Sequence, residues 1–160
     1  MQPSCAIFFS METGVEVFRH LIHSFIRRFG LLDQARTPCG MRLPVSQAHA
    51  LMEILRAPGL TQNELAERLG LSKSMVSRLV QSLVAAGRAI SQKDGRDGRA
   101  NRIVLTEKGR RVAKELDQRS LARFSDLLEQ LPASRRGSVT SALALLSEAL
   151  QHKAKKKSNS

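Results

Sequence analysis

The sequence is poor in aromatic residues and in cysteine. It contains six Phe but neither Tyr nor Trp. Proteins that bind single-stranded nucleic acid usually stack its bases on aromatic side chains, so this shortage argues against that class. Two cysteines among 160 residues are too few for a disulfide framework or a zinc ribbon. We therefore expect a protein of a reducing, intracellular compartment.

Several sequence features of other protein classes are also missing. No apolar run approaches the roughly 20 residues that cross a bilayer. The first basic residue is Arg19, so the N-terminus lacks the basic region that opens a secretory signal. The sequence has no phosphate-binding glycine loop, no GxSxG motif and no conspicuous pair of catalytic carboxylates. We expect a cytoplasmic protein that is not an enzyme, holds no cofactor and does not associate with membranes.

Positive charge is abundant and unevenly distributed. The formal net charge is +12, from 26 Lys+Arg against 14 Asp+Glu. Residues 61–111 carry eleven basic and five acidic residues, whereas residues 112–150 carry five of each. The last ten residues add four Lys and no acid, and we expect residues 152–160 to form a disordered basic tail. The excess of positive charge in residues 61–111 predicts a polyanionic partner.

The N-terminal third predicts one amphipathic helix. We expect residues 1–10 to form an arm, and the protein's true start is either Met1 or Met11. From Glu12 to Asp33 apolar residues recur at helical spacing, which predicts one apolar face. That face is either ordinary core or a subunit interface. Its residues are Val15, Phe18, Ile22, Phe25, Ile26 and Phe29.

The middle third predicts two short helices joined by a tight turn. After a helix over Val45–Leu55, Thr61 and Glu64 have the spacing of a capping box, and Gly70 ends the helix that they begin. Ser72 is a natural N-cap for the next helix, which runs to Gly87. The inner face of that helix is apolar and its outer face has no acidic residue. This arrangement is a helix-turn-helix, and its second helix can enter a major groove.

A glycine-rich hairpin and two more helices complete the predicted fold. Strands over 88–93 and 100–105 flank a tip at 94–99, and Ile90, Ile103 and Leu105 are expected on one covered face. Thr106 can cap a helix that runs to about Gln130. After Pro132, a last helix is expected from Ser134 to about Leu150.

The stretch from Leu60 to Gly109 resembles the MarR family of winged helix-turn-helix regulators. The resemblance lies in LTQNELAERLGLSKSMVSRLVQSLVAAGR followed by DGRDGRANRIVLTEKG. It implies a mainly α fold with a small β-hairpin wing and a helical dimerisation region. The expected parts are an arm (1–10), a dimerisation helix and loop (11–44), the winged helix-turn-helix domain (45–110), the C-terminal dimerisation helices (111–151) and the tail (152–160).

The expected DNA-binding residues lie on the second helix and on the hairpin. Ser, Gln and Arg can hydrogen-bond base edges, and the first turn of a helix attracts phosphate. The resemblance implies that the wing-tip Arg99 enters the minor groove and that Asp97 holds it, although Asp97 is alternatively a turn residue. Arg88 stands where the family usually has an apolar residue, and we expect it to contact phosphate. The candidate set is Ser72, Lys73, Ser74, Ser77, Arg78, Gln81, Arg88, Arg96, Asp97 and Arg99.

The resemblance also implies how the protein works and what controls it. It implies a homodimer on a pseudo-palindromic double-stranded operator, acting as a repressor that a small ligand releases. One alternative is an oxidant-sensing regulator that uses Cys5 or Cys39; another is a less specific, basic DNA-coating protein. His20 and His23 lie on one helix face, and His49 is elsewhere, but no carboxylate or thiolate partner is evident, so no metal site is expected.

Overall fold

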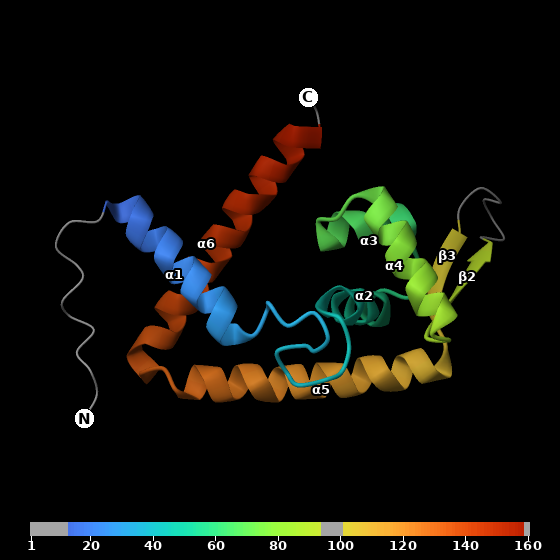
Figure 1. Cartoon of the computed structure of the whole chain (residues 1–160), viewed down its shortest axis with the longest axis horizontal. Helices are drawn as coiled ribbons and strands as arrows, with labels where there is room; N and C mark the ends of the chain where they lie inside the picture. Colours follow the sequence, from blue (N-terminus) through green and yellow to red (C-terminus); the bar gives the residue numbers. More distant parts are fainter. Residues whose placement is uncertain (1–12, 94–100, 159–160) are drawn as a thin grey trace. The chain divides into compact units, whose positions relative to one another are not determined.

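The computed structural model describes residues 13–93 and 101–158, with side chains for 13–92 and 101–151. The chain divides into two compact units, residues 1–45 and 46–160. Helices α1 to α6 and strands β1 to β3 are labelled in Figure 1. The predicted fold class, mainly α with a small hairpin, is confirmed.

The first unit contains α1, Gly14–Phe29, and a loop. Glu16 accepts a hydrogen bond from the Thr13 backbone N–H at 2.8 Å, and Gly30 ends the helix in the left-handed region at φ 86°. The helix is therefore shorter than the predicted Glu12–Asp33. No residue of α1 is buried. Its apolar face is consequently not part of a buried core, and its role as a subunit interface stays a prediction.

The second unit begins with three short helices. Helix α2 spans Val45–Arg56, α3 spans Gln62–Leu69 and α4 spans Lys73–Ala85. Thr61 and Glu64 form the predicted capping box at the start of α3: the Thr61 N–H and hydroxyl donate to the Glu64 carboxylate at 2.7 and 2.9 Å. These two hydrogen bonds hold the pKa of the Glu64 carboxyl below its ordinary value.

A three-stranded antiparallel sheet follows, in the order β1-β3-β2. Strands β2, Ala89–Lys93, and β3, Asn101–Leu105, form the predicted hairpin. The very short β1, Leu60–Thr61, pairs with β3 and was not predicted, because two residues show no alternation.

The predicted position of Ile90 is wrong. The register pairs Ala89 with Leu105 and Ile90 with Val104, so Ile90 lies on the other face of the hairpin and is 40% exposed. Because successive strand residues point to opposite faces, the covered face is instead formed by Ala89, Ile103 and Leu105.

Two long helices complete the second unit. Helix α5, Glu107–Glu129, is capped by Thr106 as predicted. Helix α6 runs from Ala133 to Ser158, so the expectation of a disordered tail from residue 152 is wrong up to Ser158. The Gln, Ala and Lys residues there have high helix propensity, and Lys is favourable at a helix C-terminus. None of the helices within the described residues has the length and apolar character of a membrane span.

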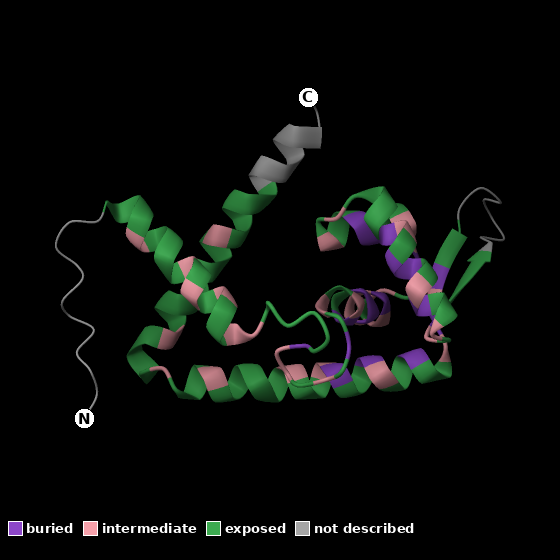
Figure 2. Ribbon diagram, viewed as in Figure 1, coloured by how far each residue is buried: buried purple, intermediate pink, exposed green. Residues whose placement is uncertain are grey.

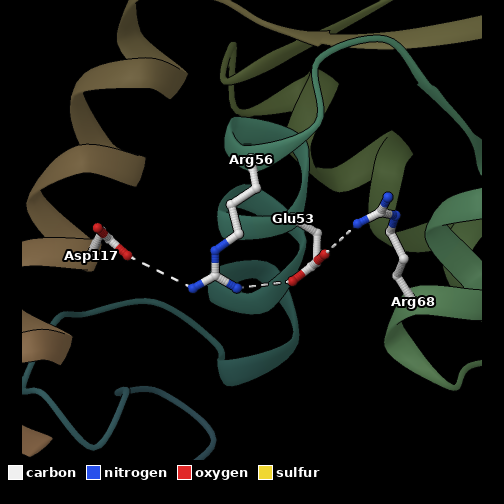
Figure 3. Close-up of polar contacts among 4 residues, drawn as sticks. All are labelled: Glu53, Arg56, Arg68 and Asp117. Atoms are coloured by element: carbon white, nitrogen blue, oxygen red, sulfur yellow. Dashed lines mark hydrogen bonds and ion pairs between the residues drawn. The ribbon is translucent and has the colours of Figure 1, made fainter.

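Helices α2, α3 and α4 share one hydrophobic core with β3 and the N-terminal half of α5 (Figure 2). Its fully buried large side chains are Leu51, Ile54, Val76, Leu65, Leu83, Ile103 and Leu116. At the surface of this core, the Glu53 carboxylate on α2 lies 3.1 Å from Arg56 and 3.3 Å from Arg68 of α3 (Figure 3). Arg56 also faces Asp117 of α5 at 3.9 Å. Helix α4 contributes Val76 and Leu83 to this core, so packing against the neighbouring elements fixes its orientation.

Candidate nucleic-acid interface

Helix α4 begins as the sequence predicts. The Ser72 hydroxyl oxygen accepts a hydrogen bond from the Met75 backbone N–H at 3.3 Å and lies 3.1 Å from the Ser74 hydroxyl. The inner face, Val76, Leu79, Val80 and Leu83, is buried. Burial of that face fixes which residues face outward.

The structure exposes most of the α4 residues that the sequence singled out. Ser77 is half-buried, and the others are exposed; these are Ser72, Lys73, Ser74, Arg78 and Gln81. The helix carries two cationic side chains and no acidic one. An exposed helix face of this composition can donate hydrogen bonds to phosphates and to base edges in a major groove.

Arg88 occupies a different position from the rest of this set. Its side chain is half-buried, and Nη1 donates to Gln47 Oε1 of α2 at 3.0 Å. The Gln47 amide in turn donates to the Ser82 hydroxyl of α4 at 3.2 Å, and Ser82 donates to the Leu79 carbonyl at 2.7 Å. The guanidinium is thus directed toward α2 rather than fully exposed to solvent.

The turn from α4 to β2 lies against the first turn of α5. Three consecutive carbonyl oxygens accept hydrogen bonds there: that of Ala86 from Lys108 Nζ at 2.9 Å, that of Gly87 from the Thr106 hydroxyl at 2.7 Å, and that of Arg88 from the Thr106 N–H at 3.0 Å. The approach is close enough to require glycine at position 109. A Cβ there would overlap the Arg88 carbonyl oxygen and lie 2.8 Å from its carbon.

Three of the wing candidates cannot be placed. Arg96, Asp97 and Arg99 lie outside the described residues. The strands on either side are paired up to Lys93 and Asn101, so the tip is flanked by a regular ladder. The roles of these three residues remain predictions.

Two exposed residues, one on α4 and one on β3, were not singled out from the sequence. Met75 lies in the first turn of α4 and is 51% exposed, although its apolar character had suggested no role there. Arg102 of β3 is exposed and donates from Nη1 to the Gly59 carbonyl at 2.9 Å. An apolar residue breaking a polar helix face was the available signal for Met75.

Among the described residues, the cysteine and histidine candidates form no cluster that could hold a metal ion. Cys39 is half-buried, with Sγ 3.1 Å from the Thr37 hydroxyl, and Cys5 lies outside the described residues. His20, His23 and His49 are exposed. Over residues 13–93 and 101–158, no three His, Cys, Asp or Glu side chains are grouped so as to hold a metal ion.

A comparison with known protein families finds a match to the middle part of the chain. The sequence model of the MarR family matches residues 43–100, which comprise α2 to α4 and the hairpin strand β2. The chain is similar to MarR-family proteins over these 58 of its 160 residues. The predicted resemblance is thereby confirmed, together with the winged helix-turn-helix fold.

Three known proteins illustrate what this chain is similar to. The transcriptional regulator AdcR of Streptococcus pneumoniae is 39% identical over 70 residues; the match covers 44% of this chain and 47% of AdcR, about half of that relative's length. The DNA complex of MepR from S. aureus has a TM-score of 0.65 at 21% identity and covers 88% of this chain and 99% of that one. PcaV of Streptomyces coelicolor with its natural ligand has a TM-score of 0.66 at 22% identity and covers 88% and 98%. At these identities, the two solved structures establish the fold alone.

Proposed function

We propose that this protein is a sequence-specific, double-stranded DNA-binding transcriptional regulator of the MarR family. The observation that carries the proposal is the outer face of α4, which is exposed, cationic and free of acid on a helix whose inner face is buried. In this proposal α4 enters the major groove. The proposal includes no enzymatic activity, since the matched relatives are transcriptional regulators.

The roles of the α4 residues follow from their chemistry. Lys73 lies in the first turn, where its ammonium and the free backbone N–H groups of the helix end attract phosphate. Arg78 and Gln81 lie further along the same exposed surface and can each form a bidentate pair with a purine. Ser72, Ser74 and Ser77 supply shorter hydroxyl donors. From the wing, Arg96 and Arg99 reach the backbone or minor groove, with Asp97 holding Arg99.

Exposed apolar residues support a homodimer. Besides α1, the second half of α5 and much of α6 carry large apolar side chains that are at least a third exposed. Large exposed apolar side chains on several helices are typical of a protein interface. The exposed members are Val15, Phe18, Leu21 and Phe25 of α1, Leu121, Phe124 and Leu128 of α5, and Val139, Leu143, Leu145 and Leu150 of α6. A two-fold dimer would present two copies of α4 to a pseudo-palindromic operator.

A repressor released by a small ligand completes the proposal. It is supported by the similarity of residues 43–100 to the MarR family, and by solved structures of the same fold that include one bound to DNA and one bound to its natural ligand. Oxidant sensing through Cys5 or Cys39 and non-specific DNA coating are the alternatives that the experiment must separate from it.

Selection from a pool of random duplexes tests the proposal. The wild-type protein should enrich one pseudo-palindromic sequence, with half-sites about one helical turn, 10–10.5 bp, apart. Arg78→Ala should abolish or shift the enrichment, whereas Arg135→Ala removes an equal charge from an exposed position on α6 and should not. Recovery of unrelated sequences would favour a coating protein.

A further inference from the structure

The turn between α4 and β2 is the point at which the groove-reading helix and the wing meet. The backbone at residues 86–88 contributes three carbonyl acceptors to α5. On its other side the Arg88 N–H donates to the Leu83 carbonyl at 2.9 Å, which ties it to the last turn of α4. A shift of this turn therefore moves both DNA-reading elements together.

The Arg88 side chain ties the same turn to α2. Its guanidinium, Gln47 and Ser82 form a chain of hydrogen bonds from the base of the wing, through α2, to the third turn of α4. Arg88 Nε is buried and has no hydrogen-bond partner among the described residues. The bond from Nη1 to Gln47 therefore directs the guanidinium toward α2, and Nε adds no second bond there.

We infer that Arg88 is a positioning residue, which sets the orientation of α4 relative to the wing through Gln47 rather than by touching DNA. This inference rests on the proposed DNA-binding function. It replaces the sequence-based expectation of a phosphate contact with a different role for the same residue. It also assigns a role in operator discrimination to Gln47, which lies on α2 away from the outer face of α4.

Salt dependence separates the two roles of Arg88. If Arg88 touches phosphate, its removal lowers the slope of log affinity against log salt by about 0.9. A positioning role leaves the slope unchanged and lowers the ratio of operator to scrambled-duplex affinity. We expect Arg88→Met to lower that ratio roughly three- to tenfold, the effect of removing one hydrogen bond.

Two further variants make the test independent of charge. Arg88→Lys keeps the cation but lacks the planar fork that reaches Gln47, so it should behave like Arg88→Met. Gln47→Leu should reduce the affinity ratio by a similar factor. The double variant Gln47→Leu/Arg88→Met should reduce the ratio no further than the single variant with the larger reduction. A role in stability alone would lower the melting temperature without changing the ratio measured well below it.

The result that would overturn the inference is equally specific. If Arg88→Lys binds like wild type while Arg88→Met shows a weaker salt dependence and binds all duplexes less well, Arg88 contacts phosphate. Additive effects in the double variant would also overturn it. Wild-type discrimination is measured first, so a wild type that binds all duplexes alike refutes the proposed function instead. In that case the positioning role is tested on the protein without DNA, by hydrogen exchange of the backbone amide of residue 88. Exchange should be faster in Gln47→Leu and Arg88→Lys than in wild type; an unchanged exchange rate would refute the positioning role.

Discussion

Replacing Gly109 with alanine should loosen the junction between α5 and the turn that follows α4. Glycine at this position lets α5 approach the Arg88 backbone, and an added Cβ would overlap the Arg88 carbonyl oxygen. The obstructing atoms are backbone, held by hydrogen bonds on both sides, so they cannot rotate away as a flexible side chain would. Helix and turn must separate.

The magnitude follows from three contributions. Overpacking a tight site costs about 1–3 kcal/mol. Separation also weakens the hydrogen bonds from the Thr106 N–H to Arg88 and from its hydroxyl to Gly87, each worth about 1 kcal/mol. Alanine in place of glycine within a helix returns about 1 kcal/mol. The net decrease in unfolding free energy is therefore about 2–4 kcal/mol, or a melting temperature lower by about 4 °C or more.

Thermal and denaturant unfolding, followed by circular dichroism at fixed protein concentration, measure this decrease. Gly137→Ala is the matched control: it lies inside α6 and its Cβ would meet nothing within 4 Å, so it should stabilise by up to about 1 kcal/mol. If Gly109→Ala is as stable as wild type, or gains stability as Gly137→Ala should, the close approach of α5 to this turn is refuted.

Three further predictions concern DNA binding, pH and assembly. Arg78→Ala should relax discrimination at one base pair in duplex titrations, because Arg78 is proposed to read a base edge; an equal loss of affinity for all duplexes would contradict this. Because the folded-state pKa of Glu64 is lowered, its stabilisation is full at neutral pH and is lost as pH falls through that pKa. The stability gap between wild type and Glu64→Gln should therefore close in urea titrations as the pH falls from neutral into the acid range below the ordinary pKa of a Glu carboxyl; a constant gap contradicts this. Leu121→Glu, at a 64% exposed site on α5, should sediment as a folded monomer where wild type sediments as a dimer; a variant that stays dimeric contradicts the proposed interface.

Local signals made most of the fold predictable. The cap at Ser72, the box formed by Thr61 and Glu64, and the helix spacing of Val76 to Leu83 each depend on residues close in sequence. These signals fixed the two helices of the motif and the start of α5 at Thr106. The exposed outer face of α4 followed directly, because burial of one helix face determines the other.

Features that depend on distant residues were not predictable. The pairing of Leu60 with Ile103 and the register that exposes Ile90 are set by contacts across more than ten residues of chain. The inward turn of Arg88 depends on Gln47, 41 residues away, and an arginine beside a cationic helix reads in sequence as a DNA contact. The helical continuation to Ser158 was not predicted because the charge of the tail suggested disorder more strongly than its helix propensity suggested order.

The central claim is that α4 reads a specific operator in the major groove. The most direct test is the ratio of dissociation constants for the selected duplex and a scrambled duplex of equal length and composition, measured at physiological salt. The proposal predicts a ratio of at least about 10³ in favour of the operator. A ratio near one would contradict it and identify the outer face of α4 as a non-specific cationic surface.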